Sequence, residues 1–193
     1  MAAHPQHHHW TLEQYIEHER YTGIRHEYID GQIYAMTGGT LRHAHISGNI
    51  FFVLKSALRG GPCVPFNTDA GISAQTKRKY FYPDVSVVCG EIEIDPALPE
   101  RIANPIVLVE VLSTGTEEYD KTTKFNYYKL IPSLRDYLIV EQDRPHITHY
   151  MRHADTWSSL ESDDMTDQIP LPSINFSSLM QDVYLDITWD GVL

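Results

Sequence analysis

The chain has 193 residues, of which 42% are hydrophobic and 21% are charged, a composition that suits one folded domain and excludes a disordered or low-complexity protein. Fifteen Lys and Arg against 26 Asp and Glu give a formal net charge of −11, which excludes a uniformly basic surface for nucleic acid. No apolar run approaches the roughly 20 residues that a membrane helix needs. Because an apolar secretory core is also absent, we expect a soluble, cytoplasmic protein.

The first residues and the first helix differ in composition. Residues 1–9 are polar and rich in histidine, so we expect a disordered tail there and one domain over residues 10–193. Thr11 and Gln14 have the spacing of a capping box, and apolar residues follow at helical steps. This pattern predicts a short helix that ends near Arg20.

Glycines mark the limits of the next two elements. Strand-like runs on either side of Asp30 and Gly31 predict a β-hairpin, because this dipeptide tolerates the positive φ of a tight turn. Residues 43–59 carry apolar side chains at three- and four-residue steps and are followed by Gly60. This pattern predicts a long amphipathic helix that covers the core.

Strands are expected to dominate the middle of the chain. We predict short strands at residues 63–66 and 70–75 and one continuous strand at residues 80–89. The charges and prolines of residues 91–104 predict a loop. The nearly continuous apolar run at residues 105–112 is typical of a strand buried on both faces, which we place at the centre of the sheet.

The remaining elements complete a mixed fold. Residues 116–130 predict a helix that ends before Pro132, and three strand-like runs follow at residues 134–141, 146–153 and 156–162. No internal repeat is visible. The order of elements predicts a mixed α+β domain with a central β-sheet flanked by helices.

The chain has two cysteines, Cys63 and Cys89. Their separation matches neither a CxxC motif nor a zinc-binding pattern. Because thiols in the cytoplasm are usually reduced, we expect no disulfide and no nucleophilic cysteine.

Acidic residues occur where burial should exclude them. Glu110 lies inside the apolar run 105–112, and a buried carboxylate is costly unless a metal ion or a cation compensates its charge. Asp84 lies among aromatic and β-branched residues of another predicted strand, so the two carboxylates can converge if these strands are neighbours. On the following helix, Lys121 and Lys124 can both reach this end of the strand.

Two carboxylates and a lysine suit the hydrolysis of a phosphodiester, because hard Mg²⁺ prefers oxygen ligands and a lysine can stabilise charge on phosphoryl oxygens. Structural roles also fit the spacing. A carboxylate at a strand end can cap a loop, a buried glutamate can pair with a core arginine, and Asp120 can form a surface ion pair with Lys124. From the spacing alone, the structural roles are favoured.

Three ordered segments carry a resemblance to a known family. They are PDVSVV at residues 83–88, PIVLVEVLSTGT at 105–116 and YDKTTKFNYY at 119–128. This series resembles the PD-(D/E)xK nuclease superfamily and, more narrowly, the Uma-type family of small bacterial restriction-endonuclease domain proteins. The similarity extends over about residues 11–189 and implies a restriction-endonuclease-like fold.

The resemblance also implies a metal site at the ends of two strands. It assigns Asp84 and Glu110 as ligands of Mg²⁺, or of Mn²⁺, and the backbone carbonyl of Val111 as a further ligand. Glu27 matches an N-terminal acidic position that completes such a site, although its carboxylate can instead pair with Arg25 or cap the hairpin.

One position departs from the superfamily pattern. Two residues after Glu110, where the motif has lysine, this chain has Leu112. In the Uma-type pattern the basic residue stands on the following helix, where Lys124 matches better than Lys121. His43 also matches a recurrent family position, but a histidine at a helix start often only caps the helix.

The remaining polar residues have simpler interpretations. His43 and His45 would lie far apart around a helix, so they are not expected to bind zinc together. His146 and His149 would point to opposite faces of a strand and are interpreted as solvated. The basic residues 77–79 are interpreted as a soluble loop, with a phosphate-backbone contact as the alternative.

The residues and the resemblance together predict a Mg²⁺- or Mn²⁺-dependent endonuclease that hydrolyses phosphodiester bonds of DNA, with RNA left open. Its candidate catalytic residues are Glu27, Asp84, Glu110 and Lys124. The alternative is a non-catalytic module that keeps the nuclease fold and binds nucleic acid or protein, as the charge of −11 favours. A glycosidase would leave Lys124 unexplained. A homodimer suits duplex cleavage, which needs two nicks.

Overall fold

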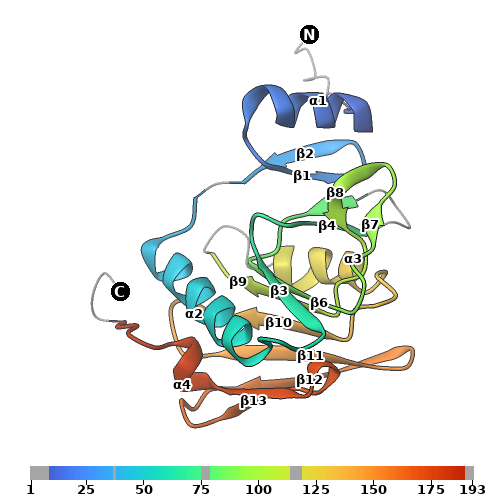
Figure 1. Ribbon diagram of the computed structural model, residues 1–193. Helices are drawn as coiled ribbons and strands as arrows, with labels where there is room; N and C mark the ends of the chain where they lie inside the picture. Colours follow the sequence, from blue (N-terminus) through green and yellow to red (C-terminus); the bar gives the residue numbers. More distant parts are fainter. Residues whose placement is uncertain (1–8, 37, 75–78, 114–118, 190–193) are drawn as a thin grey trace.

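The structure, a computed structural model, describes residues 9–36, 38–74, 79–113 and 119–189. These residues form two six-stranded β-sheets and a two-stranded one, with helices packed against them (Figure 1). No helix in these ranges is long and apolar enough to span a membrane. Apart from His9, the predicted N-terminal tail lies outside the described residues.

The predicted N-terminal helix is present as α1 (Leu12–Thr22). Its capping box is complete, because the side chains of Thr11 and Gln14 each accept a hydrogen bond from the other residue's backbone N–H. The helix ends at Gly23, which adopts the left-handed conformation that favours glycine.

The predicted hairpin is also present and opens the first sheet. Strands β1 (His26–Ile29) and β2 (Gln32–Ala35) pair antiparallel. At the turn between them, Asp30 and Gly31 have φ values of 49° and 81°, the two positive values that a type I′ turn requires. The turn chemistry therefore places Glu27 of β1 in a defined register, opposite Tyr34.

The first sheet has the strand order β2-β1-β5-β4-β8-β7. Helix α1 packs over it, and the two lie together at one end of the molecule (Figure 1). The strands that complete the sheet are β4 (Gly71–Ala74), β5 (Lys79–Phe81), β7 (Ile94–Asp95) and β8 (Leu98–Ile102).

Two sequence predictions in this region are wrong. The strand predicted at residues 80–89 is divided between two sheets, because the chain leaves β5 near Pro83, which cannot donate a backbone hydrogen bond to a sheet. The loop predicted at residues 91–104 contains β7 and β8, which pair with an irregular register. Its charges and prolines conceal the strand pattern.

The second sheet has the order β12-β11-β10-β9-β6-β3 and contains the candidate site. Its central strand β9 is parallel to β10 and antiparallel to β6. All five residues of β9 are buried, which confirms the predicted central strand. The bounds are β3 (Cys63–Asn67), β6 (Val85–Cys89), β9 (Val107–Val111), β10 (Asp136–Val140), β11 (Ile147–His153) and β12 (Thr156–Ser162).

Helices cover both faces of this sheet (Figure 1). The predicted long helix is α2 (Leu41–Ala57), which packs on one face. On the other face lie a π-helical segment (Tyr119–Lys124) and α3 (Phe125–Tyr128). They occupy the described part of the helix predicted at residues 116–130.

Alternation along β9 decides which face Glu110 meets. Val107, Val109 and Val111 point into the core under α2, and Leu108 points to the opposite face, toward α3. Because successive strand residues alternate, Glu110 shares the face of Leu108 and lies under the helix that carries Lys124.

The C-terminal part, whose structure the sequence left uncertain, returns to the face covered by α2. It consists of β13 (Gln168–Leu171), a 3₁₀ turn (Pro172–Ile174), β14 (Phe176–Leu179) and α4 (Met180–Val183).

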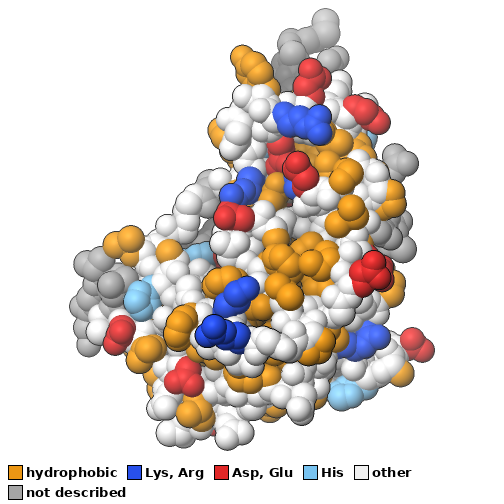
Figure 2. Space-filling view, in the orientation of Figure 1, with side chains coloured by type: hydrophobic (Ala, Val, Ile, Leu, Met, Phe, Trp, Pro, Cys, Tyr) orange, Lys and Arg blue, Asp and Glu red, His pale blue; other side chains and the backbone are white. Residues whose placement is uncertain are grey.

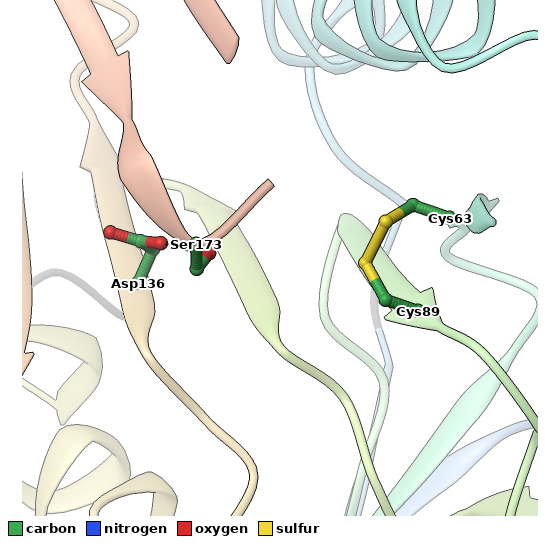
Figure 3. The surroundings of a disulfide bond; sticks show 4 residues. All are labelled: Cys63, Cys89, Asp136 and Ser173. Atoms are coloured by element: carbon green, nitrogen blue, oxygen red, sulfur yellow. Dashed lines mark hydrogen bonds between the residues drawn. A yellow bond between two sulfur atoms is a disulfide. The ribbon is translucent and has the colours of Figure 1, made fainter. Parts of the chain in front are cut away.

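The expectation of two reduced thiols is wrong. Cys63 of β3 and Cys89 of β6 form a disulfide with a Cα–Cα distance of 3.9 Å (Figure 3). The two residues are direct partners in the antiparallel register, and such partners bring their Cβ atoms close together. Sequence spacing does not reveal this pairing, because it depends on the register of β3 against β6.

Candidate active site

Charged side chains from three elements meet under the first sheet at the end of β9. Lys124 Nζ lies 2.8 Å from Glu27 Oε1 of β1, 2.8 Å from Glu110 Oε1 of β9 and 3.6 Å from Asp120 Oδ1 of its own π-helical segment. All four residues are buried. The structure thus brings together three of the four predicted catalytic residues, Glu27, Glu110 and Lys124.

The two candidate lysines have different partners. Lys124 occupies the buried cluster, whereas Lys121 Nζ lies 3.2 Å from Glu141 Oε1 and its side chain is 31% exposed. The geometry agrees with the assignment of Lys124 as the basic residue beside Glu110.

Asp84 lies at the edge of the same cluster, immediately before β6. Its Oδ2 accepts a hydrogen bond of 2.8 Å from the backbone N–H of Val111, and His43 Nε2 lies 3.3 Å from the same oxygen. The backbone of Val111 also hydrogen-bonds the His43 ring. Antiparallel pairing of β6 and β9 explains why residues 84 and 111 meet.

Sequence reasoning missed one residue of the cluster, Tyr128, and placed another, Asp120, at the surface. The Tyr128 hydroxyl donates a hydrogen bond of 2.7 Å to Glu110 Oε1; its spacing of four residues from Lys124 was the available signal, because such residues share a helix face. Asp120 was interpreted as the partner of Lys124 in a surface ion pair. This is wrong in location, since Asp120 is only 4% exposed.

Burial dominates the electrostatics of the central pair. It raises the pKa of Glu110 well above its ordinary value, an effect that the Lys124 ammonium opposes. Burial alone would lower the pKa of Lys124, but Glu110 and Glu27 outweigh it and raise that pKa well above the ordinary value. The direction of this shift favours a protonated Lys124, which serves as a hydrogen-bond donor and a positive charge in the cluster.

His43 differs from an ordinary helix-cap histidine. Burial lowers its pKa, but the hydrogen bond to Asp84 and the negative charge of Asp84 outweigh burial and give a net rise. Thr40 supplies the cap of α2 by accepting a hydrogen bond from the His43 N–H. The His43 ring is thus free to contact the carboxylate.

The donor set fits a hard divalent cation. Four carboxylates, those of Glu27, Asp84, Glu110 and Asp120, face one lysine and one histidine, so negative charge is in excess. Among the described residues, hydrogen bonds and ion pairs engage only Oε1 of Glu110 and only Oδ2 of Asp84. Each carboxylate keeps one oxygen for a metal such as Mg²⁺.

The described residues do not contain a group of three or more His, Cys, Asp or Glu arranged to hold a metal ion. The Lys124 ammonium instead lies among three of the carboxylates.

Three other interpretations of polar residues are wrong. His149 and His146 are buried, with ring nitrogens 2.8 Å from Asp136 Oδ1 and 2.7 Å from Asp163 Oδ1. Asp136 also accepts a hydrogen bond from Ser173; Figure 3 draws both side chains. Of the predicted basic loop, 77–78 lie outside the described residues, whereas Lys79 is buried in β5.

Lys79 pairs with Asp30 at the hairpin turn and lies over the ring of Tyr127, 4.3 Å from its centroid. The paired and buried ammonium leaves no charge for a phosphate contact at this position. His43 and His45 both lie on α2, where His43 Nε2 contacts Asp84 Oδ2 and His45 Nε2 contacts the Leu185 carbonyl oxygen.

Comparison with known proteins identifies the family of this chain. Residues 12–181 match the model of the Uma2 family, described as "Putative restriction endonuclease". The uncharacterized Synechocystis sp. protein slr1290 is 36% identical over 172 residues, which cover 89% of this chain and 90% of that protein. Another uncharacterized protein of that organism, sll1609, is 29% identical over 145 residues, 75% of this chain and 82% of that protein.

A solved structure shares the fold. It is described as "a putative nuclease belonging to DUF820" from Anabaena variabilis and matches with a TM-score of 0.68 at 17% identity. The match covers 89% of this chain and 93% of the other. The likeness confirms the predicted mixed α+β, restriction-endonuclease-like fold.

Proposed function

The chain belongs to the Uma2 family, and from this premise we propose that it is a Mg²⁺- or Mn²⁺-dependent nuclease that hydrolyses phosphodiester bonds of DNA. One observation carries the proposal. A buried ammonium, Lys124, lies 2.8 Å from both Glu27 and Glu110, at the strand end where the backbone of Val111 holds Asp84. This combination of charges suits a reaction in which negative charge develops on phosphoryl oxygens.

In this proposal the metal is held by Asp84 and Glu110, with the Val111 carbonyl and Glu27 as further contributors. Bound there, Mg²⁺ would polarise the phosphate and lower the pKa of a bound water. Tyr128 would keep the Glu110 carboxylate oriented through the hydroxyl that donates to Oε1.

Lys124 would orient the attacking water and stabilise charge on the phosphate. Its raised pKa keeps the ammonium protonated at neutral pH, so it can donate hydrogen bonds but cannot accept the proton of the water. Glu27 and Asp120 contact this ammonium and would hold it in place during substrate binding.

The test is cleavage of supercoiled plasmid with and without Mg²⁺ or Mn²⁺. We expect metal-dependent nicking by the wild type and a loss of at least about 100-fold in Asp84→Asn, Glu110→Gln and Lys124→Met, since each removes charge from the reacting centre. Lys121→Met is the matched control, because this lysine pairs with Glu141 outside the cluster. Full metal-dependent cleavage by Asp84→Asn would refute the assignment.

The second candidate is a non-catalytic module that binds nucleic acid or protein. Two observations favour it: the net charge of −11, and a lysine that already compensates part of the carboxylate charge. This function predicts no cleavage under any metal condition and nucleic-acid or protein binding that is unchanged by EDTA. The same plasmid assay, run beside a gel-shift measurement with EDTA, separates the two.

A further inference from the structure

One face of α2 is only partly covered by the rest of the described chain. Leu41, His45, Gly48, Phe52 and Lys55 follow each other at steps of three and four residues, which places them along one side of the helix. Phe52 is 70% exposed and Leu41 is 65% exposed. Leu41 and Phe52 are thus two large apolar side chains that stand out from this side of the helix, and exposed apolar area next to a groove is typical of a surface for a partner.

Two grooves flank Phe52, and its side chain lines both. The first, of about 480 Å³, lies between α2 and the α4 region and includes Val53, Phe176 and Asp182. The second, of about 530 Å³, lies between α2 and the edge strand β3 and includes Lys55, Arg59 and Val64. A protruding aromatic ring thus stands directly beside grooves that can receive one.

The first groove is built rigidly. Asn49 Nδ2 donates to the carbonyl oxygens of Val183 at 3.1 Å and Leu185 at 2.9 Å, and His45 Nε2 lies 3.1 Å from the Leu185 oxygen. These bonds hold the segment after α4 against α2. The groove therefore exists before any partner binds, which lowers the entropic cost of association.

Charges of opposite sign lie on the two sides of Phe52. Lys55 and Arg59 line the groove beside β3, and Asp182 lines the groove beside α4. Within the described residues, none of these three forms an ion pair. Figure 2 shows basic side chains over the C-terminal end of α2, with hydrophobic side chains next to them and acidic ones toward α4.

We propose that this surface, defined by the exposed side of α2 and its two grooves, binds a second copy of the chain across a twofold axis that passes near Phe52. In a twofold contact, the surface on one side of the axis in one copy faces the surface on the other side of the axis in the second copy. The ring of Phe52 then enters the α2–α4 groove of the partner. Lys55 and Arg59 of one copy face Asp182 of the other.

A second copy explains features that an unrelated partner would not. The protruding ring, the groove that receives it and both signs of charge occur on one surface, so the surface is complementary to itself. Gly48 adds space, because a Cβ at this position would meet nothing within 4 Å. The partner's helix can therefore approach α2 closely one turn away from Phe52.

The test is sedimentation equilibrium on the full chain. We expect a wild-type dimer and a monomer for Phe52→Glu, which places a charge in the contact. Tyr21→Glu is the matched control, because Tyr21 is an aromatic residue that is 90% exposed on α1, away from this surface, and it should stay dimeric. A wild type that is monomeric up to about 100 μM, an affinity too weak for a specific dimer, would overturn the proposal and leave the surface to another protein.

A charge exchange tests the twofold arrangement itself. Lys55→Glu and Asp182→Lys should each weaken the dimer about tenfold by juxtaposing like charges, and the combined variant should recover most of the wild-type dissociation constant. If the combined variant is as weak as either single variant, the predicted pairing across the axis is wrong. All of these residues are on the surface, so loss of folding does not confuse the result.

Discussion

Lys124 Nζ and Glu110 Oε1 lie 2.8 Å apart, and both side chains are only 6% exposed. The ammonium comes from the end of a π-helical segment and the carboxylate from near the end of β9, a fully buried strand. Neither charge is solvated, so each is stabilised mainly by the other and by Glu27 and Tyr128. The intact pair contributes little net free energy to folding, but removal of one partner is strongly destabilising, because the other charge stays buried without compensation.

Replacement of Lys124 by methionine should therefore destabilise the protein. We expect Lys124→Met to lower the free energy of unfolding by about 3 kcal/mol, because the buried Glu110 loses its cation. Urea unfolding followed by circular dichroism measures this loss. Lys121→Met removes a partly exposed ion pair with Glu141 outside the cluster and should change the free energy of unfolding by less than about 1 kcal/mol. If the two substitutions lowered the free energy of unfolding equally, Lys124 would not be the cation that stabilises the buried Glu110.

Metal binding should be visible as stability, independently of cleavage. We expect 10 mM Mg²⁺ to raise the free energy of unfolding by about 1.4 kcal/mol if the dissociation constant is about 1 mM, because the ion binds only the folded protein. The rise should disappear in Asp84→Asn and in Glu110→Gln. Glu161→Gln, which changes an exposed carboxylate of β12, is the control that should keep it. A wild type that does not respond to Mg²⁺ or Mn²⁺ would favour the non-catalytic module.

The Tyr128 hydroxyl offers a finer probe of Glu110. Removing it in Tyr128→Phe deletes a buried hydrogen bond of 2.7 Å to a carboxylate, and we expect a loss of about 2 kcal/mol in unfolding free energy. Tyr150→Phe is the comparison, because this ring packs on Phe125 without a hydroxyl partner among the described residues. If Tyr128→Phe lowered the free energy of unfolding no more than Tyr150→Phe does, the Tyr128 hydroxyl would not be stabilising Glu110.

Local signals made part of this architecture predictable. The capping box at Thr11, the Asp30–Gly31 turn and the apolar run around Glu110 each act over a few residues, and all three produced the expected element. The strands β7 and β8 were not predictable, since their pairing depends on contacts across the sheet rather than on an alternating pattern.

The residue spacing and the family resemblance predicted only part of the candidate site. They named Glu27, Glu110 and Lys124, which the fold brings within hydrogen-bonding distance. They did not show that Tyr128 and Asp120 join the cluster, because that depends on how the π-helical segment packs on β9.

The disulfide makes stability depend on redox conditions. It closes a loop with a sequence separation of 26 residues, for which chain entropy predicts a contribution of about 3 kcal/mol. We expect a thiol reductant to lower the unfolding free energy of the wild type by about this amount. The double variant Cys63→Ala, Cys89→Ala should show the lower stability with and without reductant. A reductant effect that persists in the double variant would show that the loss has another cause.

Stability at acid pH should report on Glu141, which pairs with Lys121 and Arg144 outside the cluster. Burial would raise the pKa of this carboxyl, but hydrogen bonds from Arg144 and Lys121 outweigh burial and lower it. A lowered folded-state pKa stabilises the protein above the unfolded-state pKa of about 4.3, and this contribution is lost as the pH falls through the folded value. We expect Glu141→Gln to cost up to about 1 kcal/mol at pH 7 and to approach the wild type below about pH 3. Urea unfolding at several pH values measures the difference, and a gap between the two proteins that stays constant down to pH 2 would refute this role of the carboxylate.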